Sequence, residues 1–462
     1  MRITVGLTIL HKSLRIKHPN TSPGVSRRKS VNDWIKDNIR IGIIGMGSMG
    51  KGLLYQSHIT PGIECVAVCD INVQRCIDAL TWLQLPYQVV TNSNAMDEAI
   101  SRRLVAVCQT GQWVSQCQTL HAVVEASNSI GPAGKHAMTA LDHHKHLILM
   151  NSEIDLTFGP VLSQIARKNG VICTSCDGDQ HGVLKHMIDD IRLWGFELVM
   201  AGNVKGFLDR YANPTTVVPE ADKRNLDYRM CTSYTDGTKL NIEMAIIANA
   251  YGLIVKTSGM YGPRVAHVKD VFRCFNFDVL WKSRRPFVDY IIGAEPGGGV
   301  FVIGYCDNPY QKEMLAYYKM GCGPYYLFYR PYHLCHIEAM DTIITVVSEG
   351  RDFLAPVHGI QTNVYAYAKR DLRPGERLDS VGRYMCYGKI ENLKDTIANP
   401  GLPICLADNV VLNRAIAKNQ QILMSDVAYD PDRIDFRLYA EALEQTDIKS
   451  RIGEGCVSCS SR

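Results

Sequence analysis

Residues 39–50 read Ile-Arg-Ile-Gly-Ile-Ile-Gly-Met-Gly-Ser-Met-Gly. Apart from Arg40, the first six are apolar and rich in β-branched side chains, as in a strand buried in a parallel sheet. The last six match the pattern G-x-G-x-x-G, and residues 51–58 continue with the composition of a helix. A glycine pattern between a strand and a helix is typical of a domain that binds a dinucleotide.

The three glycines have separate roles in such a loop. Gly45 permits the tight turn, Gly47 lets the backbone approach a diphosphate, and Gly50 lets the helix pack closely on the strand. The diphosphate then lies against free N–H groups at the helix N-terminus. Ser48 and Met49 therefore join these glycines in the predicted cofactor site.

An acidic residue follows the second predicted strand, residues 64–69. Asp70 lies about 20 residues after the last glycine, where a carboxylate accepts hydrogen bonds from the adenosine ribose. It favours NAD, because it would repel the 2′-phosphate of NADP. Arg75 is near enough in the sequence to offset that repulsion, so the predicted cofactor is NAD or NADP.

Further β-type runs alternate with helical patterns at residues 104–108, 122–126, 147–150 and 171–174. This alternation predicts an α/β fold with a doubly wound parallel sheet, a Rossmann domain, over residues 39–175. We expect an α+β substrate and dimerisation domain over 176–355, a small β-rich module over 356–445 and a tail over 446–462. Within the module, strand-like pieces lie at residues 363–368, 401–404 and 421–423.

Residues 1–38 differ from the rest in their charge. They are rich in Lys and Arg, and no acid comes before Asp33. They contain no long apolar segment of the kind that a secretory signal needs, although an organelle transit peptide would share the basic bias. We expect a basic leader without fixed structure.

Composition narrows the function classes. The chain has 462 residues, 46% hydrophobic and 21% charged, with a net charge of +4. This charge is too small to indicate nucleic-acid binding, and no segment approaches the roughly 20 apolar residues of a membrane span. The 16 cysteines form no compact framework, which fits reduced thiols in the cytoplasm. We expect a cytoplasmic protein with a small-molecule substrate.

Two lysines are candidates for the chemistry of hydride transfer, which needs a proton donor or a positive group near the substrate oxygen. Lys205 follows the apolar run 196–200 and precedes a glycine, where it can contact substrate or lie in a solvated turn. Lys239 and Glu243 share one face of a helix predicted over 236–251. In their apolar surroundings they could poise a proton, or they form an ordinary exposed ion pair.

Two polar segments complete the candidate site. Asp177 and Asp179, in the segment that follows the strand 171–174, could bind a divalent ion or orient a lysine, or they cap a turn. In residues 329–333, Arg330 can hold a carboxylate or phosphate and Tyr332 or His333 could transfer a proton, unless the segment is only a buried polar cluster.

We predict catalytic roles for Lys205, Lys239, Glu243 and His333. We predict substrate contacts for Asp179, Gln180, Arg330 and Tyr332, and we assign no metal-binding residue.

Several of these motifs together carry a family resemblance. They are the glycine loop 45–50, Gly178-Asp179-Gln180, Gly202-Asn203-x-Lys205-Gly206, Asp236-Gly237-Thr238-Lys239, Tyr329-Arg330-Pro331-Tyr332-His333, and the segment 368–376. Over residues 39–426 the chain resembles homoserine-dehydrogenase-like oxidoreductases that carry a C-terminal SAF domain. This family includes a branch similar to 1-deoxy-D-xylulose 5-phosphate reductoisomerase, which uses NADPH.

The resemblance implies a homodimer, and a substrate pocket lined by Lys205, Lys239, Arg330, Tyr332 and His333. It also marks a departure, because homoserine dehydrogenases follow the corresponding strand with Asn-Lys. Here Asn151 is followed by Ser152, so that lysine is missing.

The sequence thus predicts an NAD(P)-dependent oxidoreductase. Its predicted substrate is a small polar hydroxy or keto compound, phosphorylated or not, as for a reductoisomerase-like or sugar-precursor enzyme. Homoserine dehydrogenase is the alternative within the family. A dinucleotide-binding sensor or scaffold without turnover is the alternative from another class.

Overall fold

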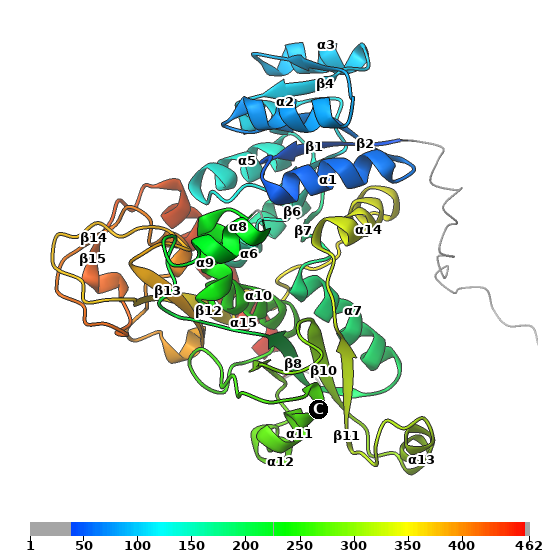
Figure 1. Cartoon of the computed structure of the whole chain (residues 1–462), viewed down its shortest axis with the longest axis vertical. Helices are drawn as coiled ribbons and strands as arrows, with labels where there is room; N and C mark the ends of the chain where they lie inside the picture. The colour runs from blue at the N-terminus through cyan, green and yellow to red at the C-terminus, as the bar shows by residue number, and fades with distance from the viewer. Residues whose placement is uncertain (1–37, 225, 458–462) are drawn as a thin grey trace, which may run out of the picture.

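The computed structural model describes residues 38–224 and 226–457 (Figure 1). Its larger sheet has seven strands in the order β3-β4-β2-β1-β5-β6-β7, and all neighbouring strands are parallel. The strands are β1 (Ile39–Ile44), β2 (Ile63–Cys69), β3 (Tyr87–Val89), β4 (Val105–Cys108), β5 (Ala122–Glu125), β6 (His146–Leu149) and β7 (Cys173–Ser175). Without the edge strand β3, this is the strand order of a Rossmann fold, so the predicted doubly wound sheet is confirmed.

Helices cover both faces of this sheet. One face carries α1 (Ser48–Ile59), α2 (Val73–Trp82) and α14 (Cys335–Glu349). The other carries α3 (Ser93–Ser101), α4 (Gly111–Gln116), α5 (Gly131–Asp142) and α6 (Ser152–Lys168). Six strands were predicted from their apolar runs. Strand β3 was missed because its three residues are exposed or half-buried and give no apolar run.

A second sheet has four strands in the order β11-β10-β8-β9. Its strands are β8 (Glu197–Lys205), β9 (Phe287–Ile292), β10 (Val300–Tyr305) and β11 (Tyr325–Arg330). Strands β8 and β9 are parallel, and the other two pairs are antiparallel. Helix α7 (Gln180–Leu193) packs on β8 and β10. The short helices α11 (Val271–Cys274) and α12 (Phe277–Leu280) belong to a hydrophobic cluster, rich in aromatic residues, that also contains residues of β8, β9 and β10. Helix α13 (Pro309–Tyr317) lies between β10 and β11 in the chain.

Helix α10 (Thr238–Tyr251) connects the parts of the molecule. Every residue from Thr238 to Ala250 is buried, as expected for a helix with apolar residues on all sides. It contacts α6, α7, α9 (Tyr228–Thr235) and β9, and strands β12 and β13 of the C-terminal module, which we define as residues 356–433. Helix α8 (Val218–Arg224) precedes α9.

The C-terminal module pairs β12 (Thr362–Ala368) with β13 (Cys386–Asn392), and β14 (Val411–Leu412) with β15 (Val427–Ala428), both antiparallel. The predicted strand at 363–368 is confirmed, and β13 was missed. The strand-like interpretation of 401–404 is wrong at Ile404, because residues Ile404–Leu406 form a 3-10 turn, whereas Gly401 and Pro403 form isolated β-bridges with Leu423 and Tyr365. The identity of this module as a SAF domain stays a prediction.

The last helix, α15 (Ile434–Val457), crosses the predicted start of the tail at residue 446. It packs on α5 and α6 of the Rossmann part, although its sequence follows the module. Residues 458–462 and all but the last residue of the predicted leader lie outside the described residues. In the part of the chain that the structure describes, no helix has the length and apolar character that a membrane crossing requires.

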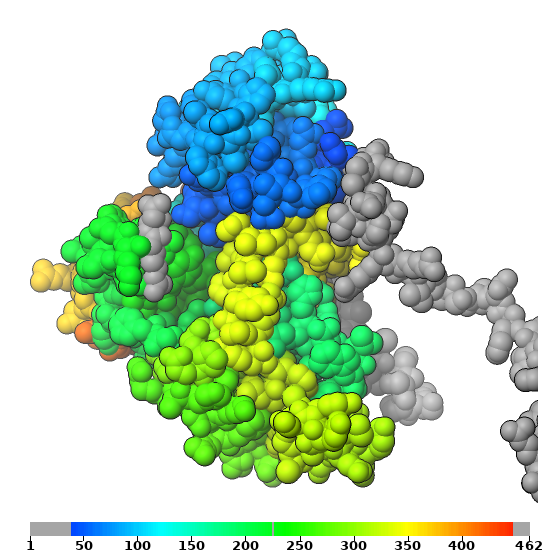
Figure 2. Space-filling model, turned by 45° about the vertical axis from the view of Figure 1, so that its right-hand side comes forward, coloured from blue at the N-terminus to red at the C-terminus, as the bar shows by residue number. Residues whose placement is uncertain are grey.

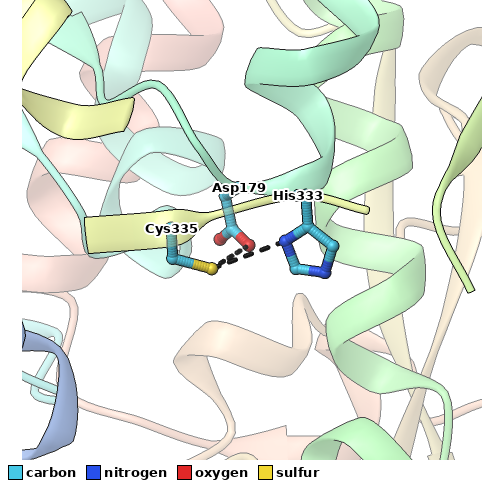
Figure 3. A group of neighbouring side chains, drawn as sticks. All are labelled: Asp179, His333 and Cys335. Carbon is cyan, nitrogen blue, oxygen red and sulfur yellow. Dashed lines mark hydrogen bonds between the residues drawn. The ribbon is translucent and has the colours of Figure 1, made fainter. Parts of the chain in front are cut away.

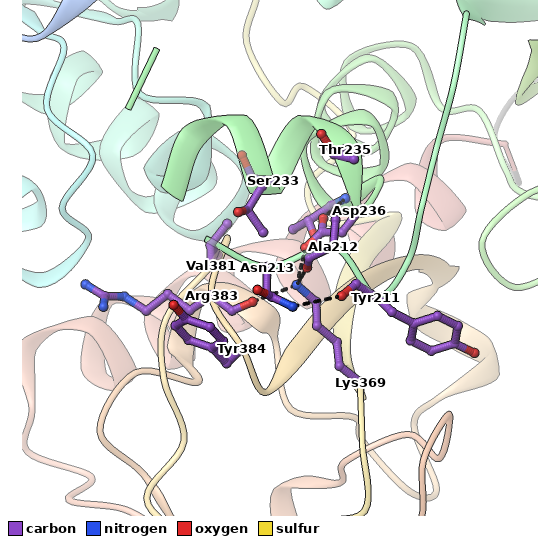
Figure 4. A network of polar contacts seen from close by, with 12 residues as sticks. Tyr211, Ala212, Asn213, Ser233, Thr235, Asp236, Lys369, Val381, Arg383 and Tyr384 are labelled. Carbon is purple, nitrogen blue, oxygen red and sulfur yellow. Dashed lines mark hydrogen bonds and ion pairs between the residues drawn. The ribbon is translucent and has the colours of Figure 1, made fainter. Parts of the chain in front are cut away.

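A buried ion pair joins the C-terminal module to the start of α10 (Figure 4). The Nζ atom of Lys369 lies 2.8 Å from Oδ2 of Asp236, and the two side chains are 3% and 0% exposed. The same ammonium donates to the backbone oxygens of Ala212, at 2.6 Å, and Arg383, at 2.7 Å. Asp236 in turn accepts from the N–H of Thr238 at 2.8 Å. The module therefore helps to fix where α10 begins.

Replacing Lys369 with Met should strongly destabilise the protein. The substitution leaves the Asp236 carboxylate buried without its cation, which costs about 3–5 kcal/mol in comparable pairs. Denaturant unfolding measures the change. Arg370→Gln is the matched control, since Arg370 pairs with Glu376 at the surface and its loss should cost less than about 1 kcal/mol. Equal small losses for both variants would contradict the proposed anchoring.

Candidate active site

The glycine loop after β1 has the shape that a bound diphosphate requires. Gly45 has φ +97°, and a Cβ there would lie 2.6 Å from the backbone nitrogen of Ser127. A Cβ on Gly50 would lie 1.8 Å from the carbonyl oxygen of Gly45, whereas one on Gly47 would meet nothing within 4 Å. Gly47 is also the N-cap of α1 and leaves the helix N-terminus without a side-chain cap. The open side of the loop thus faces free N–H groups that can receive phosphate.

Asp70 braces this loop against the end of β2. Its Oδ2 accepts from the N–H of Met46 at 2.8 Å, and its Oδ1 accepts from the N–H of Asn72 at 2.8 Å. Arg75 lies 4.0 Å from Oδ1, with 57% of its side chain exposed. Each carboxylate oxygen has a second lone pair, so Asp70 can still accept from a ribose hydroxyl as predicted.

The ammonium group of Lys239 is the centre of a buried polar cluster. It donates to the hydroxyl of Ser152 and lies 3.5 Å from Oδ2 of Asp179. Carboxylate oxygens of Glu153 and Glu243 are each 4.0 Å away. The alternative interpretation of Lys239 and Glu243 as an exposed ion pair is therefore wrong, since both are buried.

This cluster lies at the edge of the sheet that carries the glycine loop. Ser152 follows β6, and Asp179 follows β7. Since all seven strands are parallel, these residues lie at the same edge as Gly45 and Asp70, where ligands bind in such sheets. Helix α10 thus brings Lys239 from a distant part of the sequence to the predicted cofactor edge.

Strand β8 brings a second lysine beside the cluster. Nζ of Lys205 donates to Oε1 of Gln180 at 3.0 Å, and the side-chain amide of Asn203 donates to the same oxygen. Asn203 and Lys205 are two residues apart and therefore lie on one face of the strand. Gln180 begins α7, so it links the second sheet to the loop that follows β7.

The segment before α14 closes over Asp179 from another side (Figure 3). Nδ1 of His333 lies 3.2 Å from the carbonyl oxygen of Gly178 and 3.5 Å from Sγ of Cys335. That sulfur lies 3.7 Å from Oδ1 of Asp179. Figure 2 shows yellow parts of the chain at the surface between the blue Rossmann part and green parts of the chain. His333 and Asp179 are thus neighbours, in line with the sequence-based placement of both in one candidate site.

Two predicted substrate residues have other partners. Arg330 forms an ion pair with Glu338, and its guanidinium lies 4.5 Å from the centre of the Tyr332 ring. Tyr332 is 53% exposed. Arg330 is therefore already held by a carboxylate. Their contact with substrate stays a prediction.

Sequence reasoning missed Ser152, Glu153 and Cys335 as members of the site. Ser152 stands at the position of the lysine in the Asn-Lys of homoserine dehydrogenases, and that departure was the available signal. Nothing in the local sequence of Cys335 marks it, because its partners His333 and Asp179 meet it only in the folded chain.

The surroundings shift the pKa values of the two lysines in opposite directions. Burial lowers the pKa of Lys205. Burial would also lower that of Lys239, but the charges of Glu153, Asp179 and Glu243 hold its pKa well above the usual range. Lys239 therefore stays an ammonium, whereas Lys205 is the lysine that can exchange a proton nearer neutral pH.

The pKa values of two carboxyl groups in the cluster are also shifted in opposite directions. Burial alone would raise the pKa of Asp179, but Lys239, His181, His333 and Lys205 hold it well below its usual value. Burial, together with the charge of Asp179, raises the pKa of Glu243 to about 8. At neutral pH the site therefore holds an ionised Asp179 and a mostly protonated Glu243.

Substitutions at two glycines should separate packing from ligand binding. Gly50→Ala places a methyl group against the Gly45 carbonyl oxygen and should lower the melting temperature and abolish binding. Gly47→Ala meets nothing within 4 Å and should keep the melting temperature, but weaken NAD(P) binding at least tenfold, about 1.4 kcal/mol. Thermal unfolding and cofactor fluorescence measure the two effects. Unchanged affinity in Gly47→Ala would place the ligand elsewhere.

Glu243→Gln should change how stability depends on pH. The pKa of Glu243 rises from 4.5 to about 8 on folding, so between these values the folded chain holds a proton that the unfolded chain releases. The stabilisation that Glu243 contributes to the folded state is fully present below pH 4.5 and is lost as pH rises through about 8.

Urea unfolding from about pH 5 to about pH 9 should therefore show the wild type losing stability relative to Glu243→Gln. Glu313→Gln, at an exposed position of α13, is the control and should run parallel to the wild type. A parallel curve for Glu243→Gln would show that Glu243 is ionised in the folded state.

Known proteins resemble parts of this chain. Residues 178–339 match the family model described as the catalytic domain of oxidoreductase DRL. Homoserine dehydrogenase of Synechocystis sp. is 23% identical over 137 residues, which are 29% of this chain and 28% of that enzyme. The chain thus spans less than a third of the length of the curated relative that it matches.

Solved structures of dehydrogenases are similar to parts of this chain at low sequence identity. A probable dehydrogenase from Thermotoga maritima is 11% identical, covering 68% of this chain and 90% of its own, with a TM-score of 0.42. The scyllo-inositol dehydrogenase of Lactobacillus casei, solved with NAD(H) and scyllo-inositol, is 14% identical, covering 58% and 74%, with a TM-score of 0.36. The family model and the curated relative confirm the resemblance to homoserine-dehydrogenase-like oxidoreductases that the sequence motifs predicted.

Proposed function

We propose that the protein is an NAD(P)-dependent oxidoreductase that transfers a hydride between its cofactor and a small polar hydroxy or keto compound. One observation carries the proposal. The buried Lys239 lies against residues that follow β6 and β7, at the same sheet edge as the glycine loop. Cofactor and proton-handling groups would therefore meet in one site.

The residues of the glycine loop fit a dinucleotide. The open side of Gly47 and the uncapped N-terminus of α1 would hold the diphosphate, with Ser48 and Met49 in the first turn. Asp70 would hold the adenosine ribose, and Arg75 beside it is compatible with a 2′-phosphate. Bound NAD or NADP supplies the hydride acceptor or donor.

The two lysines divide the remaining work. When an alcohol is oxidised, the neutral amine of Lys205 would accept the proton of the hydroxyl oxygen, while the carbon that bears this hydroxyl gives its hydride to the cofactor. In reduction, its ammonium returns that proton to the oxygen. The permanent charge of Lys239 stabilises the negative charge that develops on this oxygen. Asp179 holds Lys239 in place, and Glu243 and His333 complete the proton network.

The cluster also supports a substrate with several hydrogen-bonding groups. Among the described residues, buried atoms without a hydrogen-bond partner include Nδ1 of His181, Oδ1 of Asn203 and Oε2 of Glu243. Such atoms are rare in native proteins and require an explanation. Hydroxyl groups of a polar substrate would satisfy them, which fits a reductoisomerase-like or sugar-precursor enzyme.

Homoserine dehydrogenase activity is the second candidate, and one contact bears on it. The family's Asn-Lys is Asn151-Ser152 here, but Ser152 accepts a hydrogen bond from Lys239. A lysine of α10 thus delivers a positive charge to the place where the resemblance expects one. The lost lysine is therefore no obstacle to the same reaction type.

A sensor or scaffold without turnover is the competing class. Such a protein needs a dinucleotide site, but it does not need a buried lysine, a half-buried lysine and three buried carboxyl groups beside that site. We include homo-oligomerisation and a cytoplasmic location in the proposal, as the resemblance and the composition imply.

The proposal predicts that Lys239→Met loses turnover and keeps cofactor binding. Full-length protein is titrated with NADH and NADPH, and the preferred cofactor is used with a panel that begins with deoxyxylulose phosphate and aspartate semialdehyde. Loss of Lys239 should lower kcat by about 10²- to 10⁴-fold with an unchanged cofactor Kd. Lys282→Met, at an exposed position, is the control.

Two results would contradict this function. Absence of binding to either cofactor would remove the dinucleotide site. Binding without turnover across the panel, with a cofactor-dependent change in oligomeric state, would favour the sensor.

A further inference from the structure

A second cluster of ionisable groups lies outside the lysine site. Asp177 is in the loop after β7, His186 is on α7 and Asp341 is on α14. One ligand atom from each lies within 4.8 Å of the other two, and Nε2 of His186 is 2.7 Å from Oδ2 of Asp177. We propose that these three side chains bind a divalent transition-metal ion, with Zn²⁺ as the best-fitting ion.

The charges of the cluster suit a cation. It combines two carboxyl groups with one imidazole, so its net charge is negative even when His186 is protonated. The neighbouring Lys185 does not neutralise it, because its ammonium lies 2.6 Å from a carboxylate oxygen of Asp189. A divalent ion would compensate the charge that remains.

The orientation of the side chains also suits a metal. Oδ1 of Asp177 accepts from the N–H of Gly178 at 2.6 Å, which fixes the carboxylate and leaves Oδ2 for the ion. The ring of His186 packs beside Phe353, with centroids 5.2 Å apart. Asp177 is 4% exposed and His186 is 42% exposed, so the protein encloses one side of the site and water can complete the coordination.

The donor set selects the class of metal. Imidazole favours zinc and its neighbours, and carboxylate oxygens are accepted by the same ions. Zinc binds such atoms at about 2.0–2.2 Å, so ligands around a tetrahedral ion lie about 3.3 Å apart. Nε2 of His186 and Oδ2 of Asp177 are 2.7 Å apart, and all three ligand atoms lie within 4.8 Å of one another, so small side-chain movements would reach that spacing.

An ion at this position would tie together three elements that shape the lysine site. Asp177 is two residues before Asp179, and α14 begins at Cys335, which contacts Asp179. The N–H of Asp177 already donates to Thr342 of α14 at 2.9 Å. The ion would strengthen this link without touching the reacting groups. The sequence offered Asp177 and Asp179 as possible ligands of a divalent ion, but not His186 or Asp341.

The test uses full-length protein dialysed against a chelator and titrated with Zn²⁺ by calorimetry, with thermal unfolding in parallel. We expect one ion per chain and a higher melting temperature with zinc. Asp341→Asn and His186→Gln should each weaken binding at least tenfold. Asp190→Asn, an equal charge change at an exposed position of α7, should bind as the wild type does.

A second control distinguishes the other cluster that could hold an ion, formed by Asp179, His333 and Cys335. Cys335→Ala should leave zinc affinity unchanged. The proposal is overturned if zinc does not bind, if Asp341→Asn and His186→Gln bind as tightly as wild type, or if Cys335→Ala abolishes binding. The readout needs no turnover, so it stands apart from the proposed oxidoreductase function.

Discussion

Complete burial of helix α10 is the constraint on which the site depends. A helix enclosed on all sides cannot expose its polar residues, so Lys239 and Glu243 must find partners inside the protein. The ammonium of Lys239 is met by Asp179 at 3.5 Å, with two further carboxylates at 4.0 Å. Asp179 and Glu153 follow strands of the parallel sheet, whereas Glu243 lies on α10 itself. The contacts that neutralise Lys239 thus hold α10 against the edge of the Rossmann sheet that carries the glycine loop.

The same constraint gives the C-terminal module a structural role. Strands β12 and β13 pack on α10, and backbone N–H groups of Gly388 and Ile390 donate to Thr238 and Asn241 at 2.9 Å each. Together with the Lys369 ion pair, these contacts fix the helix along its first two turns. The module therefore helps to fix the position of Lys239, and this role does not depend on whether the module is a SAF domain.

Local sequence patterns predicted much of this architecture, but they could not predict contacts between residues that are far apart in the sequence. The apolar run and glycines of residues 39–50 were sufficient for the Rossmann part, because strand, turn and helix are adjacent in sequence. The spacing of Lys239 and Glu243 placed them on one helix face. It could not show that Asp179 is the nearer carboxylate, nor that Ser152 and Cys335 join the cluster, since these meet only after the sheets assemble. Strand β13 was missed because its β-forming residues are mixed with glycine, lysine and asparagine.

The central claim is that the glycine loop and the lysine cluster form one site. A crystal structure with the preferred dinucleotide bound tests it most directly. We expect the diphosphate against Gly47 and the N-terminus of α1, and the nicotinamide ring beside the cluster of Lys205 and Lys239. A dinucleotide whose nicotinamide ring lies away from both lysines would contradict this account.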